Sequence, residues 1–234
     1  MCKPYVYFCL TVILCACTNN QNIGEQYLGK PYTESPLGEE KFPDTDPLFR
    51  EDGFDCQTFV ETSLANKNIK KLNKIRYKNS NVDFLSRNHF VESDWLENNA
   101  DIVFNASKQY AKTKLRTVVI DKQNWFKKIH NIKTSIPTKT VHLEYIPFAN
   151  LNQIKNKKTM IVLFIVGKSK NIDILGTDLA VVHMGFLLPG GKVLRHASST
   201  KGCVVDMNFE EYIAQRKQNK NNIGIVLLDI KNDK

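Results

Sequence analysis

Residues 53–66 read GFDCQTFVETSLAN, and this stretch decides how the rest of the chain is interpreted. The spacing i, i+3, i+4, i+7 and i+8, which marks one face of a helix, is occupied by Cys56, Phe59, Val60, Ser63 and Leu64. Asp55 stands where an N-cap residue accepts hydrogen bonds from the first free backbone amides. The stretch therefore predicts a helix over residues 55–66 with Cys56 in its first turn.

The position of a cysteine at the start of a helix affects the ionisation of its thiol. The free amides and the helix dipole at that end favour the thiolate, which is the nucleophilic form of the side chain. Gly53 and Phe54 give the chain a sharp turn into the helix. A buried structural cysteine would have the same local sequence, so Cys56 alone leaves two interpretations open.

Two histidines lie in neighbouring apolar segments further along the chain. His183 stands inside residues 179–188, and His196 follows the turn at residues 189–191. A histidine in such a strand is either a core residue or a positioned base. In an antiparallel hairpin the two imidazoles could lie side by side, and His196 could orient His183 by accepting its far N–H. Together with Cys56 they would form a nucleophile, a base and an orienting group.

The order of the predicted elements indicates an α+β fold. Upstream we expect a loop at residues 33–53, a helix end and a loop at 67–80, and helices and loops at 83–130, with one helix near 121–130. Downstream we expect a helix at 209–218 and strands at 139–147, 160–166, 179–188, 192–197 and 223–230. Helices that precede an antiparallel sheet are typical of α+β proteins rather than of alternating β-α-β folds.

The N-terminus indicates export. Residues 5–13 are almost wholly apolar, which is too short for a bilayer span of about 20 residues and has the length of a signal-peptide core. The ending Leu14-Cys15-Ala16-Cys17 resembles a bacterial lipobox, which implies cleavage before Cys17 and a lipid on its thiol. An ordinary signal peptide cut nearby is the alternative. We expect a signal peptide and lipobox at 1–17, a tether at 18–25 and one catalytic domain at 26–234.

Processing of this kind changes the cysteine count. Cys2, Cys9 and Cys15 would leave with the signal peptide, so only Cys56 and Cys203 would keep a thiol. An exported protein could join these two in a disulfide. The other interpretation is a free, reactive Cys56, with Cys203 as a small core or loop residue.

Composition and net charge narrow the range of possible binding partners. The chain has 42% hydrophobic and 24% charged residues, as globular proteins do, and a formal net charge of +9 that favours anionic partners. No basic run is interleaved with stacking aromatics, so nucleic-acid binding is not expected. No histidine pair stands at zinc-ligand spacing, and Asp44, Asp46, Asp52 and Asp55 do not form a metal-ligand set. We expect a monomer without metal or cofactor.

Several blocks resemble a known superfamily. Residues 27–32, 53–56, 183–185 and 195–198 resemble the tyrosine, nucleophile, base and third-residue blocks of the NlpC-type, papain-like peptidoglycan hydrolases. Residues 54–61, 86–90, 94–95 and 196–202 resemble one branch in particular, the N-acetylmuramoyl-L-alanine amidase-like family. These blocks run from about residue 24 to about residue 215.

The resemblance implies a fold and a mechanism. The fold would be papain-like, with an N-terminal nucleophile helix packed on an antiparallel sheet and a helical insertion at about 83–130. Cys56 would attack an amide carbonyl, His183 would act as base and then as acid, and His196 would orient His183. The backbone amide of Cys56 and the Tyr32 hydroxyl would stabilise the oxyanion. In that family the bond joins the lactyl group of N-acetylmuramic acid to L-alanine.

Alternatives stay open at this stage. Related branches cut between D-glutamate and a diamino acid, acyl transfer is another possible chemistry, and a non-catalytic wall-binding lipoprotein could keep the same fold. Arg87 and His89 either contact the substrate or buttress the insertion. Glu61 is either solvated or paired with a nearby lysine. The exported protein would face the cell wall, and Thr18 after the acylated cysteine favours the outer membrane if the organism is Gram-negative.

Overall fold

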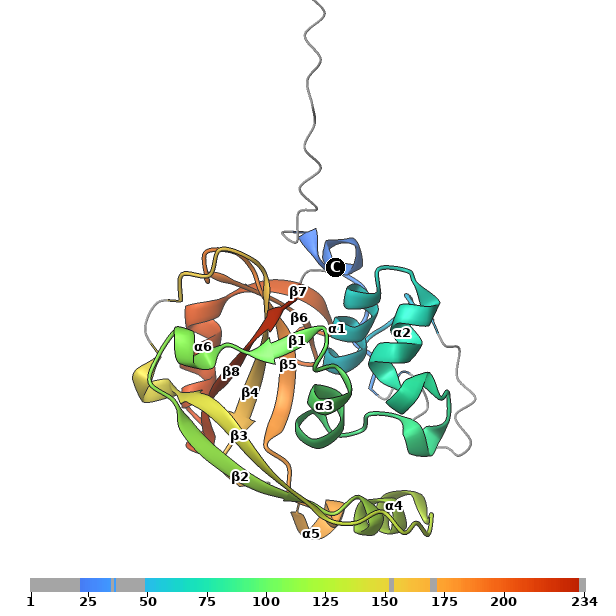
Figure 1. The fold of residues 1–234 in the computed structure, drawn as a ribbon. Helices are drawn as coiled ribbons and strands as arrows, with labels where there is room; N and C mark the ends of the chain where they lie inside the picture. The colour runs from blue at the N-terminus through green and yellow to red at the C-terminus, as the bar shows by residue number, and fades with distance from the viewer. Residues whose placement is uncertain (1–21, 35, 37–48, 152–153, 169–171, 232–234) are drawn as a thin grey trace, which may run out of the picture.

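The computed structural model describes residues 22–34, 36, 49–151, 154–168 and 172–231, and over these residues the protein has an α+β architecture (Figure 1). The strands are β1 (Val103–Asn105), β2 (Lys114–Ile120), β3 (Lys139–Pro147), β4 (Met160–Val166), β5 (Val181–Leu187), β6 (Val193–Ser198), β7 (Cys203–Asn208) and β8 (Asn222–Ile230). The helices are α1 (Cys56–Ala65), α2 (Ile69–Arg76), α3 (Leu96–Asn98), α4 (Lys122–His130), α5 (Ile172–Leu175) and α6 (Phe209–Lys217). The predicted α+β class is confirmed.

The described strands form one antiparallel sheet in the order β2-β3-β8-β4-β5-β6-β7, with β1 alongside β8. The two central strands, β4 and β8, carry apolar side chains on both faces because each face is covered. Val226 and Leu228 join the core under α1, whereas Ile225 and Leu227 join the core under α6. The sheet therefore separates two hydrophobic layers.

Helices α1 and α2 pack together through a buried ion pair. Glu61 Oε2 accepts a hydrogen bond from Arg76 Nε at 2.8 Å, and both side chains are almost wholly buried. The expectation that Glu61 is solvated or paired with a lysine is therefore wrong. Residues 67–80 also hold more helix than we predicted, because the two buried apolar residues of α2, Leu72 and Ile75, are outnumbered by polar neighbours that obscure the period.

The segment at 83–130 is only partly helical, so the expected helical insertion needs correction. Helix α4 lies where a helix was predicted, but β1 and β2 are strands. Strand β2 pairs with β3 along its whole length, from Lys114 opposite Tyr145 to Ile120 opposite Lys139. Apolar residues occupy both faces of β2, so its sequence lacks the alternation that would reveal a strand.

This same segment also fixes the start of β5. The turn of π-helix at Val91–Trp95 places the buried Glu92 carboxylate beside the strand, where Oε1 accepts the backbone N–H of Ala180 at 2.5 Å. The backbone N–H of Val181 donates to the same oxygen at 3.4 Å. The strand that carries His183 is therefore anchored from outside the sheet.

The C-terminal predictions agree with the structure, apart from one strand. The strands β3, β4, β5, β6 and β8, the turn between β5 and β6, and helix α6 lie where the sequence placed them. Strand β7 was not predicted, because only Val204 of its six residues is fully buried. No described helix is long and apolar enough to cross a bilayer.

Residues before the expected domain boundary at residue 26 already pack against the domain. Residues 22–25 belonged to the predicted tether, yet Ile23 packs against the core, and its carbonyl oxygen accepts a hydrogen bond from Arg195 Nη1 at 3.1 Å. The predicted signal peptide, the lipidated Cys17 and the first part of the tether lie outside the described residues.

Candidate active site

Cys56 is held in the first turn of α1 by a reciprocal cap. The Asp55 carboxylate accepts the backbone N–H of Thr58 at 2.7 Å, and Thr58 Oγ1 accepts the backbone N–H of Asp55 at 3.0 Å. The predicted helix and its N-cap are thus confirmed. Helix α1 packs against β5 and β6, so the cysteine faces the strands that carry the two histidines.

Tyr32 reaches the cysteine through a short backbone ladder. The backbone N–H of Phe54 donates to the carbonyl oxygen of Pro31 at 3.0 Å, and the backbone N–H of Thr33 donates to the carbonyl oxygen of Phe54 at 3.0 Å. A side chain at Gly53 would collide with Thr33 Oγ1, since an added Cβ would lie 2.2 Å away. The glycine therefore allows the two segments to approach closely, which places Tyr32 beside Cys56.

The two histidines meet across β5 and β6. His183 Nε2 lies 2.7 Å from His196 Nδ1, and the ring planes are nearly perpendicular at 83°. Helix α6 adds Tyr212, whose ring centroid lies 5.0 Å from that of His196 and 6.1 Å from that of His183. The sequence-based expectation that the imidazoles lie side by side agrees with this geometry.

These side chains share one pocket of about 530 Å³. Its lining comprises Tyr32, Cys56, Val182, His183, His196, Ser198, Ser199, Thr200, Lys201, Met207, Tyr212, Gln215, Arg216 and Asn222. Among these described residues the permanent charges are the cations Lys201 and Arg216, and none is a carboxylate. The pocket therefore combines a thiol, two imidazoles and a positive electrostatic environment.

Burial affects the pKa of the Cys56 thiol more strongly than the start of the helix does. Burial, with a smaller contribution from the negative charge of Asp55, raises the pKa of Cys56 to about 12, although the backbone amides of Met184, Cys56 and Gln57 act to lower it. The sequence-based expectation that the helix start favours the thiolate is wrong for the resting molecule, because desolvation penalises the anion. Cys56 is a neutral thiol whose charged form would be stabilised by nearby amides.

Shifted pKa values also keep the two histidines and Tyr32 uncharged. Burial and then the charge of Arg216 lower the pKa of His196 to about 4. Burial, His196 and Arg216 hold the pKa of His183 well below its usual value. Burial and the charges of Cys56 and Asp55 raise the pKa of Tyr32 to about 12, so its hydroxyl remains a hydrogen-bond donor. The pocket thus presents an unprotonated imidazole beside an un-ionised thiol.

A family model for N-acetylmuramoyl-L-alanine amidase-like (AmiA-like) proteins matches residues 22–224. The chain belongs to the AmiA-like family. The match spans both sides of the pocket, from Tyr32 to Asn222. No curated protein matches this chain.

Solved structures show the same fold as this AmiA-like chain. A Legionella pneumophila protein is 22% identical, with a TM-score of 0.83, covering 93% of this chain and 89% of its own. A Bacteroides uniformis protein named an N-acetylmuramoyl-L-alanine amidase is 23% identical, with a TM-score of 0.69, covering 92% of this chain and 99% of its own.

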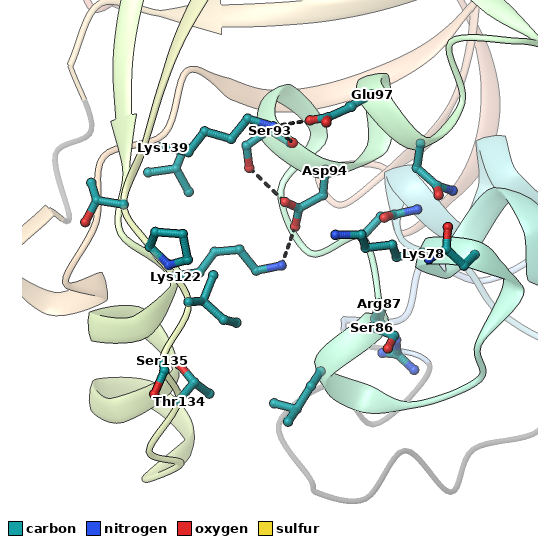
Figure 2. Close-up of a pocket in the computed structure, with 18 of the residues that line it drawn as sticks. Lys78, Ser86, Arg87, Ser93, Asp94, Glu97, Lys122, Thr134, Ser135 and Lys139 are labelled. Atoms are coloured by element: carbon teal, nitrogen blue, oxygen red, sulfur yellow. Dashed lines mark hydrogen bonds and ion pairs between the residues drawn. The ribbon is translucent and has the colours of Figure 1, made fainter.

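The structure places Arg87 and His89 away from the Cys56 pocket of the AmiA-like domain. Arg87 lines a separate cavity of about 990 Å³, shown in Figure 2, where Lys122 pairs with Asp94 at 2.8 Å. His89 Nε2 lies 2.7 Å from the Phe84 carbonyl oxygen, within a cluster of aromatic rings. This geometry fits the buttressing interpretation of His89.

Met207, Tyr212 and Arg216 are among the pocket-lining residues that sequence reasoning missed. Tyr212 and Arg216 stand four residues apart on α6, which places them on one face of the helix. The spacing can be read from the sequence, but the sequence does not show which surface this face of α6 packs against. Met207 lies on β7, the strand that was not predicted.

The predicted disulfide alternative does not apply. Cys56 and Cys203 are both free thiols. Cys203 begins β7, opposite Ser198 of β6, and is half-buried. In the described part of the chain, no group of three or more His, Cys, Asp or Glu side chains is placed to hold a metal ion.

Proposed function

We propose that this AmiA-like protein is a cysteine amidohydrolase that cleaves the N-acetylmuramoyl–L-alanine bond of bacterial peptidoglycan, on a papain-like, NlpC-type fold. Cys56 is the nucleophile, His183 the base and His196 the residue that orients it. The observation that carries the proposal is that these three side chains line one pocket, with the imidazoles 2.7 Å apart.

The reaction begins with a proton transfer. His183 takes the proton of the Cys56 thiol as the sulfur attacks the amide carbonyl carbon. Because the thiol and the imidazole are both neutral at rest, the thiolate forms only as the attack proceeds. The amides at the start of α1 and the Tyr32 hydroxyl donate to the oxyanion of the tetrahedral intermediate.

The remaining steps restore the enzyme. The carbon–nitrogen bond breaks, and His183 returns its proton to the leaving nitrogen of L-alanine. This leaves the muramoyl lactyl group as a thioester on Cys56. A water molecule gives a proton to His183 and attacks the thioester carbonyl, which releases the lactyl carboxylate and regenerates the thiol.

Charge and family membership support the choice of substrate. The AmiA-like family and the amidase name of the Bacteroides uniformis protein favour a peptidoglycan amide. Stem peptides carry free carboxylates, and the only permanent charges among the described pocket residues are the cations Lys201 and Arg216. The net charge of +9 also favours an anionic wall polymer.

The cellular location is part of the same proposal. Export with a lipid on Cys17 would hold the domain at the membrane, facing the wall. Labelled palmitate should enter the wild-type protein but not a Cys17→Ser variant. Equal labelling of the two proteins would overturn the lipidation without touching the proposed chemistry.

The test compares two cysteine variants on defined muropeptides, with the products identified by mass spectrometry. Cys56→Ala should lose at least about 10³-fold in rate while it stays folded by circular dichroism. Cys203→Ala is the matched control, because that thiol is also free but does not line the pocket, and it should keep the wild-type rate.

The products decide between the candidate functions. A free lactyl carboxylate and a peptide that begins with L-alanine would support the proposed bond. A peptide that begins with the diamino acid would replace it with D-glutamyl endopeptidase activity, and a product joined to another acceptor would indicate transfer. Wild-type activity in Cys56→Ala would overturn the mechanism. Equal wall binding by both proteins with no product would indicate a binding protein.

A further inference from the structure

His196 is in contact with two different partners through its two ring nitrogens. Its Nδ1 lies 2.7 Å from His183 Nε2, and its Nε2 lies 3.3 Å from Met207 Sδ. A thioether sulfur carries no hydrogen, so it can only accept a hydrogen bond. The contact with Met207 is therefore favourable only when His196 bears a proton on Nε2.

Sheet register explains how the methionine reaches this position. Across β6 and β7, His196 lies opposite Val205. Met207 follows two residues later, so it lies on the same face of the sheet and is a diagonal neighbour of His196. A long, unbranched side chain can span this diagonal separation.

A proton on His196 Nε2 has a consequence for His183. A neutral imidazole has a single N–H, so Nδ1 of His196 then carries a lone pair. The 2.7 Å contact therefore requires His183 to donate from its Nε2. The proton of His183 is thereby placed on Nε2, and its Nδ1 is left free to accept a proton.

The opposite arrangement disables the base. If His196 carried its proton on Nδ1, it would donate to His183 Nε2, and the lone pairs of His196 Nε2 and the Met207 sulfur would face each other at 3.3 Å. His183 would then carry its proton on Nδ1. Its ring would have no free nitrogen to accept the proton of a thiol.

We propose that Met207 is a positioning residue that sets the tautomer of His183 through His196, so that Nδ1 of His183 is the basic nitrogen. The inference rests on the proposed function, because it assigns His183 as the base. Met207 does not touch the reacting atoms. It acts by accepting one hydrogen bond at the far end of the His183–His196 pair.

Nitrogen NMR of histidine-labelled protein tests the tautomer directly, since protonated and unprotonated ring nitrogens have well-separated chemical shifts. In the wild type, His183 and His196 should both carry their proton on Nε2. In Met207→Leu, which keeps the bulk but has no acceptor, the His196 signals should move toward a mixture of the two tautomers. A wild-type His196 that is protonated on Nδ1, or unchanged signals in Met207→Leu, would overturn the inference.

Kinetics supply the second readout. Met207→Leu should lower kcat about 2- to 10-fold with little change in KM, which corresponds to the loss of one ordinary hydrogen bond. Met207→Gln offers an amide oxygen as acceptor and should recover most of the lost kcat. Equal losses in the two variants would point to a merely structural role and contradict the inference.

Controls distinguish a failure of this inference from a folding defect and from a failure of the proposed function. Met160→Leu makes the same exchange at a buried methionine of the core under α6 that does not line the pocket, and it should change neither kcat nor the histidine signals. Circular dichroism of each variant checks the fold. An active Cys56→Ala variant would refute the proposed function whatever the tautomer. An inactive Cys56→Ala variant together with the other His196 tautomer would refute only the role of Met207.

Discussion

At the scale of single residues, burial sets the protonation state of the pocket. Desolvation is the largest cause of the raised pKa of Cys56 and of the lowered pKa values of His183 and His196. Arg216 adds to the effect on both imidazoles, while Asp206 acts on His196 in the opposite sense. A base of this kind stays unprotonated in mildly acidic solution.

The pH dependence of the reaction follows from these directions. Catalysis needs His183 unprotonated, and its lowered pKa extends the unprotonated form to lower pH. We therefore expect kcat/KM to stay nearly flat from pH 8 down through pH 6.5, the ordinary pKa of histidine, and to fall only at lower pH, where His196 also becomes protonated with a pKa of about 4. The measurement is kcat/KM from pH 3.5 to 8 on a soluble muropeptide.

Removing the neighbouring charge provides the comparison for this profile. Arg216→Met takes a cation away from both imidazoles, so their pKa values should rise and the acidic limb should move toward higher pH. If the wild-type limb already stood at pH 6.5 or above, the imidazoles would have ordinary pKa values. The proposed neutral resting state would then be wrong.

At the scale of elements, the close approach of β5 and β6 brings the two histidines together. Gly185 lies in β5 and faces the backbone of β6. A Cβ added there would lie 2.8 Å from both the Arg195 carbonyl oxygen and His196 Cβ. Backbone atoms cannot move aside as a flexible side chain does. Gly185 therefore fixes the spacing on which the 2.7 Å contact between His183 and His196 depends.

Gly185→Ala should thus damage stability and activity together. The added methyl group should push β6 away from β5 and cost about 1–3 kcal/mol of the free energy of unfolding, as overpacking in cores does. It should also separate the imidazoles and lower kcat by about tenfold or more. Urea denaturation and steady-state kinetics measure the two effects.

Gly167→Ala is the matched control for this prediction. Gly167 directly follows β4, and a Cβ added there would stay 3.4 Å from its nearest neighbours, Asn221 Oδ1 and Ile223 Cγ2. We expect near wild-type stability and kcat for it. A Gly185→Ala enzyme that keeps kcat within twofold of wild type would show that strand spacing does not position the pair.

At the scale of the whole molecule, the last strand of the chain stands in the middle of the sheet. Strand β8 pairs with β1, β3 and β4, which come from well-separated parts of the sequence. Its side chains enter both hydrophobic layers. The sheet therefore cannot close until the C-terminal segment is in place.

Truncation tests this dependence. A chain that ends at residue 221 lacks β8 and should show no cooperative thermal unfolding, because both cores and the partners of β3 and β4 are lost together. A chain that ends at residue 231 keeps the strand and should unfold close to the wild-type temperature. Cooperative unfolding of the shorter chain would mean that the two layers are stable independently of β8.

Local features of this protein could be predicted from short stretches of its sequence. The period of residues 55–66 predicted α1 and its cap, and dense apolar runs predicted β4, β5 and β8, because a repeating pattern and a capping residue act within a few neighbours. The family resemblance, carried by short motifs, agrees with the family model that matches residues 22–224.

Features that depend on residues far apart in the sequence could be recognised only in the folded molecule. Strand β2 was recognisable only through its partner β3, and Met207 only through the register of β6 and β7. The protonation of Cys56 was misjudged for the same reason. A helix start favours a thiolate through the adjacent amides, but the burial that outweighs them comes from strands more than a hundred residues away.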